Sequence, residues 1–143
     1  MQFHFLHLQR PYRFEAPLAG AFVLLLEVSD PAVTPGEQTE LSRAIATSGC
    51  RYALCRGVGC SSWDDSLDEA SVVAEIDGRP QPFLMTTWHE DEPLEDVLEF
   101  MLERTAFDDF VPTAFVLAEL GGEGRKLAEA RAALERVSRG STP

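Results

Sequence analysis

Four short apolar runs alternate with four amphipathic segments along this chain, and the alternation limits its fold more than any other feature. The apolar runs cover residues 21–28, 52–55, 83–88 and 113–120. Runs of this length and content are typical of strands that are buried on both faces. Because a helix joins each strand to the next, the strands should be parallel, with helices on both faces of the sheet. The sequence therefore predicts an α/β domain.

The predicted fold is a small doubly wound, mostly parallel four-stranded sheet of the flavodoxin or Rossmann type. Right-handed crossovers favour an order such as 2-1-3-4 for these four strands, numbered along the chain. Residues 3–8 read as a further short strand, which we expect to pair at an edge of the sheet. With 143 residues and 45% apolar content, the chain should form a single ordered domain over 1–143, with 138–143 as a frayed tail.

Local signals mark where the helices between these strands begin. Thr34 and Glu37 form a capping box around Pro35, which predicts a helix start at that proline. Ser62 is the expected N-cap of the second helix, ahead of acidic residues in its first turn. The acidic residues of segment 91–93 precede the third helix, where carboxylates complement the helix dipole.

The net charge is −12, from 12 basic and 24 acidic residues. This balance argues against non-specific binding to nucleic acid or to an anionic membrane, because both are polyanions. The charge is also unevenly distributed. Residues 64–109 contain 15 acidic and two basic side chains, whereas the rest of the chain contains nine acidic and ten basic ones. The sequence therefore predicts one acidic face on an otherwise balanced domain.

The acidic residues around the third predicted helix have two interpretations. They lie away from its apolar side, at Glu92, Glu95, Asp96, Glu99 and Glu103. A solvated surface is the first interpretation, since like charges on an exposed helix cost only about 0.2–0.5 kcal/mol per pair. The second is a docking surface for a basic protein, which predicts fast association that weakens with salt.

We predict that the chain binds a basic protein partner and does not catalyse a reaction. Small acidic domains of this kind are typical of bacterial immunity and antitoxin-type proteins, which neutralise a basic toxin. Trp63, Trp88 and Phe100 are candidate aromatic anchors for the partner, although each is also suited to ordinary core packing. The sequence sets neither the identity of the partner nor the oligomeric state.

The alternative function is an enzyme or ligand-binding domain whose site lies at the carboxyl ends of the strands. Carboxylates and an imidazole follow two of the predicted strands, and such groups can hold a divalent cation or perform acid–base chemistry. The candidate ligands are Glu27, Asp30, His89 and Asp91. A nucleotide-hydrolysing domain would instead need a glutamate on the second helix, for which Glu69 and Glu75 are candidates.

A catalytic cysteine is the sharper form of this alternative. Cys60 lies next to the start of the second helix, where the helix dipole can lower the pKa of a thiol and favour the nucleophilic thiolate. His89 is the only candidate for its base, and Asp64 belongs to the same edge. The Gly57-Val58-Gly59 turn lacks the complete glycine pattern of a phosphate-binding loop, so a plain tight turn is expected.

Two segments of the chain carry a resemblance to a known family. They are 60–65, Cys-Ser-Ser-Trp-Asp-Asp, and 85–95, Met-Thr-Thr-Trp-His-Glu-Asp-Glu-Pro-Leu-Glu. Together they resemble an uncharacterised bacterial α/β domain family, a domain of unknown function, over most of the chain from about Phe22 onward. The resemblance implies a bacterial stand-alone domain. The family brings no established activity, so the resemblance assigns no role to any residue.

Nothing in the sequence is typical of membrane insertion or export. The longest apolar run near the start, 21–26, is far shorter than the roughly 18 residues that a transmembrane helix needs. The first 15 residues contain two histidines and two arginines, and no apolar block with a cleavage site. The three cysteines match neither a disulfide framework nor a zinc pattern. We therefore expect a cytoplasmic protein with reduced thiols and no cofactor.

Overall fold

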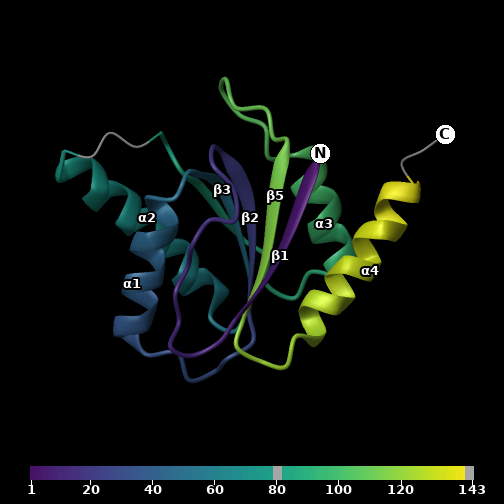
Figure 1. Ribbon diagram of the computed structural model, residues 1–143, viewed down its shortest axis with the longest axis horizontal. Helices are drawn as coiled ribbons and strands as arrows, with labels where there is room; N and C mark the ends of the chain where they lie inside the picture. Colours follow the sequence, from purple (N-terminus) through teal and green to yellow (C-terminus); the bar gives the residue numbers. More distant parts are fainter. Residues whose placement is uncertain (79–81, 141–143) are drawn as a thin grey trace.

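The computed structural model describes residues 1–78 and 82–140, which form one sheet between two layers of helices (Figure 1). In chain order the elements are β1 (Gln2–Leu8), β2 (Phe22–Val28), α1 (Pro35–Ala46), β3 (Cys50–Gly57), α2 (Cys60–Ile76), β4 (Met85–Trp88), α3 (Leu94–Glu103), β5 (Ala114–Leu120) and α4 (Arg125–Gly140). All neighbouring strands are parallel, in the order β1-β5-β2-β3-β4. This confirms the predicted α/β, flavodoxin-like fold with the N-terminal strand at an edge.

The strand order differs from the predicted one. β2, β3 and β4 follow one another across the sheet, and β5 then lies on the far side of β2, next to β1. The segment that contains α3 therefore carries the chain back across the sheet and does not add a strand beside β4. Right-handed crossovers are compatible with both orders, so handedness alone does not select between them.

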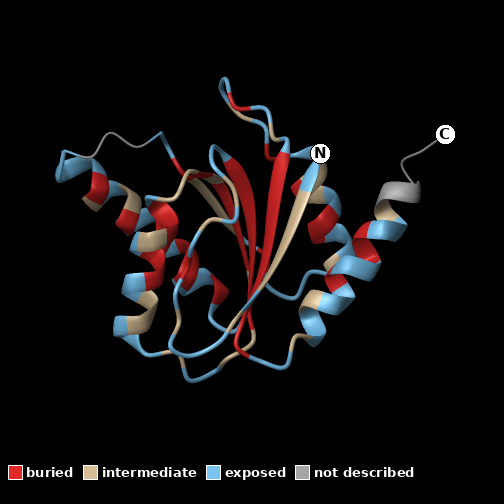
Figure 2. Cartoon of the chain, in the orientation of Figure 1, coloured by how far each residue is buried: buried red, intermediate tan, exposed pale blue. Residues whose placement is uncertain are grey.

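Two helices cover each face of the sheet. α1 and α2 pack together on one face, and α3 and α4 pack together on the other (Figure 1). The connection from β1 to β2, residues 9–21, contains no helix and packs Tyr12 and Phe14 into the core on the α1 side. Every residue of β2 and β5 is buried, because both strands lie between the two layers (Figure 2). Their near-continuous apolar content is the pattern expected of such strands.

The first helix begins as predicted, and the second does not. Thr34 accepts a hydrogen bond from the Glu37 N–H, and the Glu37 carboxylate accepts one from the Thr34 N–H, which completes the capping box. α2 begins at Cys60 and not behind Ser62; its N-cap is Gly59, which has a left-handed φ of 65°. Because β3 continues to Gly57, the glycine turn leads straight into α2 and no side chain caps the helix.

The predicted ends of β4 and of the chain also need correction. β4 begins at Met85 and not at Phe83, whose ring packs against Phe107 in the loop after α3, with the centroids 6.2 Å apart. α4 continues through Gly140, so residues 138–140 of the predicted tail are helical, and 141–143 lie outside the described residues. No described helix is both long and apolar enough to cross a bilayer.

Candidate functional site

The carboxyl end of the sheet has a topological switch point between β2 and β5. These strands are neighbours, but the helices that follow them, α1 and α4, cover opposite faces. Ligands of open α/β sheets bind at such a point. The strands are unusual there, because each apolar run carries a glutamate just before its last residue, Glu27 in β2 and Glu119 in β5.

Four ionisable residues form a row across the sheet at this end. Glu27 is the register neighbour of Glu119 on β5 and of Arg56 on β3, and His7 on β1 is the neighbour of Glu119. The row continues the α3–α4 face, because Leu25, two residues before Glu27, belongs to the core of that face. Arg56 donates a hydrogen bond to Glu27, and the two side chains are 17% and 10% exposed. Burial raises the pKa of Glu27, and Arg56 counteracts this increase.

Glu119 fills the position at which a doubly wound sheet commonly binds an anion. Its Oε1 atom accepts a hydrogen bond from the Leu127 N–H in the first turn of α4, at 3.0 Å. Its Oε2 atom accepts one from the Ser29 hydroxyl, at 2.7 Å. The free N–H groups at a helix N-terminus attract anions. Here the chain's own buried carboxylate occupies that position, which disfavours a bound phosphate.

Asp30 is also held by partners within the chain. It accepts hydrogen bonds from the Tyr12 hydroxyl at 2.7 Å and from the Ala32 N–H at 2.8 Å, and the Arg10 guanidinium lies 3.1 Å away. These contacts lower the pKa of Asp30, and the hydrogen bond from Tyr12 is the largest cause. Burial is the main cause that raises the pKa of Tyr12 to about 12. The carboxylates at the switch point are therefore held by partners within the chain.

The four predicted cation ligands do not form a group. Glu27 and Asp30 lie in the separate networks just described, His89 lies beyond the end of β4, and Asp91 is exposed, with a φ of 57°. Within residues 1–78 and 82–140, no set of three or more His, Cys, Asp and Glu side chains is arranged to hold a metal ion. The structure therefore does not assemble the predicted divalent-cation site.

The predicted pairing of Cys60 with His89 is not formed. Cys60 is buried at the start of α2, in the core on the α1–α2 face. Burial raises the pKa of its thiol and the nearby Glu90 carboxylate raises it further, which opposes thiolate formation. The His89 imidazole packs instead on Phe100 of α3, with 4.9 Å between ring centroids, and its Nε2 atom lies 2.9 Å from Thr87 Oγ1. His89 is therefore not placed to act as the base for Cys60.

Two buried polar atoms without partners flank β4, the strand at one edge of the sheet. Asp64 in α2 is 9% exposed, and its Oδ1 atom has no hydrogen-bond partner in the described part of the chain. His89 is 4% exposed, and its Nδ1 atom lies 3.2 Å from Glu92 Oε2 but outside hydrogen-bond geometry. Buried polar atoms are nearly always hydrogen-bonded, so these two need an explanation. We name Asp64, Trp88 and His89, together with β4, the β4 edge site.

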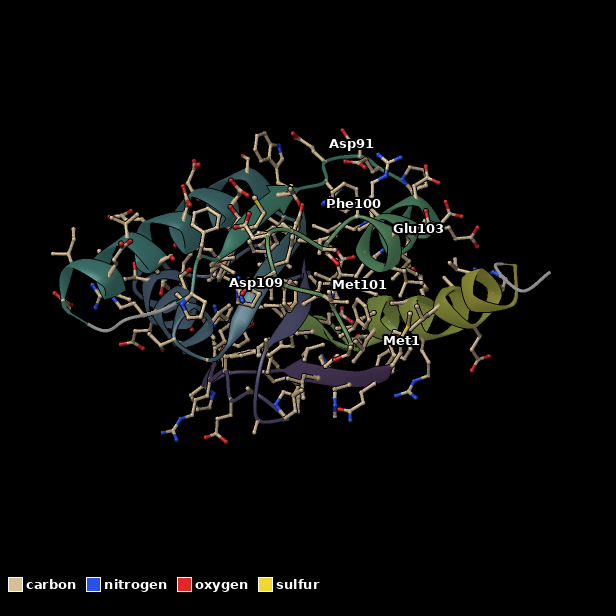
Figure 3. The ribbon with its side chains drawn as sticks, turned by 90° about the horizontal axis from the view of Figure 1, so that it is seen from above. Met1, Asp91, Phe100, Met101, Glu103 and Asp109 are labelled. Atoms are coloured by element: carbon tan, nitrogen blue, oxygen red, sulfur yellow. The ribbon has the colours of Figure 1, made fainter. Side chains whose placement is uncertain are left out.

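Acidic side chains lie on both sides of the β4 edge site. Figure 3 shows α2 and α3 on opposite sides of the sheet, with Asp91 at the β4 edge and Glu103 on the outer side of α3. The predicted partner-binding acids are all exposed: Glu92, Glu95, Asp96, Glu99 and Glu103. Glu95 accepts two hydrogen bonds from Arg136 of α4, at 2.7 and 2.9 Å, so its charge is partly neutralised within the chain.

The structure exposes one of the three predicted aromatic anchors. Trp88 is 51% exposed at the end of β4. Trp63 is 3% exposed, because it shares the apolar stripe of α2 with Leu67 and fills the core beneath that helix. Phe100 is half-buried against His89. Trp88 is therefore the anchor that a partner can reach, and Trp63 is corrected to a core residue.

The sequence interpretation missed Arg56 and the role of Glu119 as a helix cap. A signal was present, because Glu27 and Glu119 each interrupt an otherwise apolar strand. A charge buried in such a strand needs a partner with opposite charge or several hydrogen bonds. The identity of that partner depends on which strand lies alongside, which the pattern of one strand does not contain.

Asp64→Asn is expected to raise the unfolding free energy at neutral pH by about 1 kcal/mol. Burial is the largest cause that raises the pKa of Asp64; the Thr86 hydroxyl lowers this pKa, and the neighbouring Asp65 and Asp68 raise it. A carboxyl group with a higher pKa in the folded state stabilises the fold below its unfolded pKa, and this contribution is lost as the pH rises through the folded pKa. Ionised Asp64 therefore destabilises the fold at neutral pH, and the amide removes that cost.

Melting temperatures measured across the acidic to neutral range test this expectation. The variant and the parent should differ at neutral pH and converge in acid, where Asp64 is protonated. Glu40→Gln, at an exposed position of α1, removes a carboxylate without this burial and serves as the control. A lower melting temperature for Asp64→Asn at neutral pH would contradict the assignment of a destabilising buried charge.

Comparison with known proteins adds a family and no function. A family model described as a domain of unknown function, DUF7684, matches residues 3–137. The match starts well before Phe22, where the sequence resemblance was expected to begin, and therefore includes most of β1. Searches of curated proteins and of solved structures returned no match.

Proposed function

Since the chain belongs to the DUF7684 family, a domain of unknown function, we propose its function from its own geometry: it binds a basic protein at the surface around β4. We define the acidic face as the exposed carboxylates of α2, of α3 and of the turn between β4 and α3, with Trp88 among them. In its full form, the proposal is a cytoplasmic bacterial protein of the immunity or antitoxin type, which acts by binding and not by catalysis.

One observation carries the proposal: in the part of the chain that the structure describes, the acidic face has almost no cations of its own. Among the described residues of 64–109, only Glu95 and Asp109 pair with an arginine, and Glu92 lies beside the His89 imidazole. The other exposed carboxylates repel one another. A basic partner relieves this repulsion, and the field of the acidic face increases the rate at which the partner arrives.

The rest of the structure supports a site at the acidic face over one at the switch point. Glu27, Asp30 and Glu119 already have internal partners, so a ligand at the switch point would have to displace them. Trp88, in contrast, combines an exposed ring with acidic surroundings. Tryptophan is enriched among the residues that contribute most to protein–protein binding.

Neutralising three of the acidic side chains of α3 should weaken partner binding about tenfold, because each exposed charge contributes about 0.5 kcal/mol and three contribute about 1.5 kcal/mol. The variant combines Asp96→Asn, Glu99→Gln and Glu103→Gln, all at exposed positions. The partner is captured from a native lysate with the tagged parent protein, identified by mass spectrometry, and produced in pure form for titration. It should have a high isoelectric point, and its affinity should fall from low to high salt.

A matched variant on another surface controls for the change in total charge. Glu123→Gln, Glu129→Gln and Glu135→Gln remove the same number of exposed carboxylates at and just before α4. The affinity of this control should stay within a factor of about two of the parent value. A complex that is insensitive to salt, or equal losses in both triple variants, would refute the acidic face as the binding surface.

A further inference from the structure

Within residues 1–78 and 82–140, no strand pairs with the outer edge of β4. β4 stands at one end of the strand order β1-β5-β2-β3-β4, and it pairs only with β3 among the described strands. The His89 N–H donates to the Cys55 carbonyl at 2.9 Å, so the backbone of His89 is directed towards β3. Successive residues of a strand direct their N–H and C=O groups to alternate sides, so those of Thr86 and Trp88 are directed away from the sheet. Such groups can pair with a strand from another chain.

β4 is short, with four residues, but it lacks two other features by which edge strands usually prevent this pairing, proline and charged side chains. Its sequence, Met-Thr-Thr-Trp, contains no proline and no charged residue. Threonine and tryptophan also favour extended structure. The other edge strand, β1, carries two histidines and no acidic residue, so it does not attract a basic segment in the same way.

The α1–α2 side of β4 offers a buried acceptor for a cation. Thr86 and Trp88 point to this side, since their register neighbours belong to its core. The carboxylate of Asp64 lies beside Thr86, close to Asp65 and Asp68, and its buried Oδ1 atom has no partner. An arginine or lysine donor matches this oxygen in both charge and hydrogen bonding.

The α3–α4 side of β4 adds a second set of carboxylates. Thr87 points to this side, and His89 follows it with Glu92 beside the ring. The exposed acids of α3 lie beyond, on the same side of the sheet. A strand placed next to β4 would therefore have carboxylates on both of its faces, and its side chains alternate between those faces.

We infer that the partner contributes an extended basic segment that pairs with β4 as a sixth strand, with an arginine or lysine side chain on Asp64 Oδ1. Trp88 covers the face of the added strand that is directed towards Asp64. The inference rests on the proposed function and names the chemistry of its partner. Backbone hydrogen bonds set the register of the added strand. Its cationic side chains make it bind at β4 and not at the other edge strand, β1.

The test uses a short peptide in which arginine and valine alternate, titrated into the whole protein labelled for NMR. Binding should slow amide hydrogen exchange at Thr86 and Trp88 by about tenfold or more. Two N-methylated peptides serve as a matched pair: one carries the methyl groups on every arginine, the other on every valine. Each blocks the N–H groups along one edge of the extended peptide, so only one of the two should lose binding.

Asp64→Asn should weaken binding of the arginine peptide about tenfold, the effect of losing one charge-assisted contact. Because the same change is expected to stabilise the fold, a loss of binding cannot be attributed to unfolding. Glu40→Gln again serves as the control, at an exposed position of α1.

Three results would overturn the inference: no binding of the arginine peptide, equal binding of both N-methylated peptides, or unchanged exchange at Thr86 and Trp88. Suppose that one of these results is found, but the variant with Asp96→Asn, Glu99→Gln and Glu103→Gln still binds the captured partner more weakly than the parent does. The proposed function then stands, and only the strand pairing is wrong. If the affinity of the captured partner is the same for this variant and for the parent, the proposed function itself fails.

Discussion

Gly57→Ala is expected to lower the unfolding free energy by about 4 kcal/mol. Gly57 ends β3 with a left-handed φ of 91°, a conformation that costs alanine about 1–2 kcal/mol. A Cβ atom there would also clash with the Val28 carbonyl oxygen and lie 2.7 Å from Glu27 Oε2. The Val28 oxygen cannot move away easily, because it belongs to a buried strand and accepts a hydrogen bond from the Val58 N–H. Overpacking of this kind adds about 1–3 kcal/mol.

Gly59→Ala separates the clash from the backbone conformation. Gly59 also has a left-handed φ, of 65°, but a Cβ atom at this position meets nothing within 4 Å. Its substitution should therefore cost only the conformational part, about 1–2 kcal/mol. Urea unfolding followed by tryptophan fluorescence measures both variants. Equal losses at the two glycines would show that crowding against Val28 and Glu27 does not limit this turn.

Arg56→Met is expected to destabilise the protein by about 3–5 kcal/mol, the usual cost of leaving a buried charge without its partner. Arg56 donates to Glu27, and both side chains are largely buried at the switch point. Methionine retains most of the apolar stem of arginine, so the loss reports mainly the missing charge. Arg104→Met, at an exposed position after α3, should change the unfolding free energy by less than about 0.5 kcal/mol.

A second substitution and the pH dependence identify Glu27 as the cause. Glu27→Gln combined with Arg56→Met removes the buried charge and should recover most of the lost stability. The pKa of Glu27 is already raised by burial, and loss of Arg56 removes the cation that lowers it. A raised folded pKa stabilises the fold below the unfolded pKa and loses that contribution as the pH rises. The defect of Arg56→Met should therefore shrink as the pH falls, and a constant defect would exclude Glu27.

The helix starts show which parts of the fold local sequence decides. The capping box of α1 was predictable because Thr34 and Glu37 are three residues apart and bond through the local backbone. The start of α2 was not, because β3 continues to Gly57 through its pairing with β2. An element whose end depends on a neighbouring strand cannot be located from its own residues alone.

The candidate site follows the same division. The position of Asp64 and His89 near the carboxyl end of the sheet was predictable, because both follow apolar strands in an α/β pattern. Their separation on two sides of β4 was not, because it depends on which helix covers which face. The bonds at the switch point join residues 29 and 90 positions apart, and no local pattern specifies such pairs.

By itself, the sequence determined the α/β class, the position of most helices and strands, and the concentration of acidic charge between residues 64 and 109. These features depend on hydrophobic period, capping residues and charge counts, which are properties of short segments. The tertiary structure alone decided the strand order, the closure of the switch point by Glu119 and Arg56, and the free edge beside Trp88. The physical reason is that crossovers of one handedness permit several strand orders, and the neighbours supplied by the chosen order decide which charges are paired and which strand edge stays open.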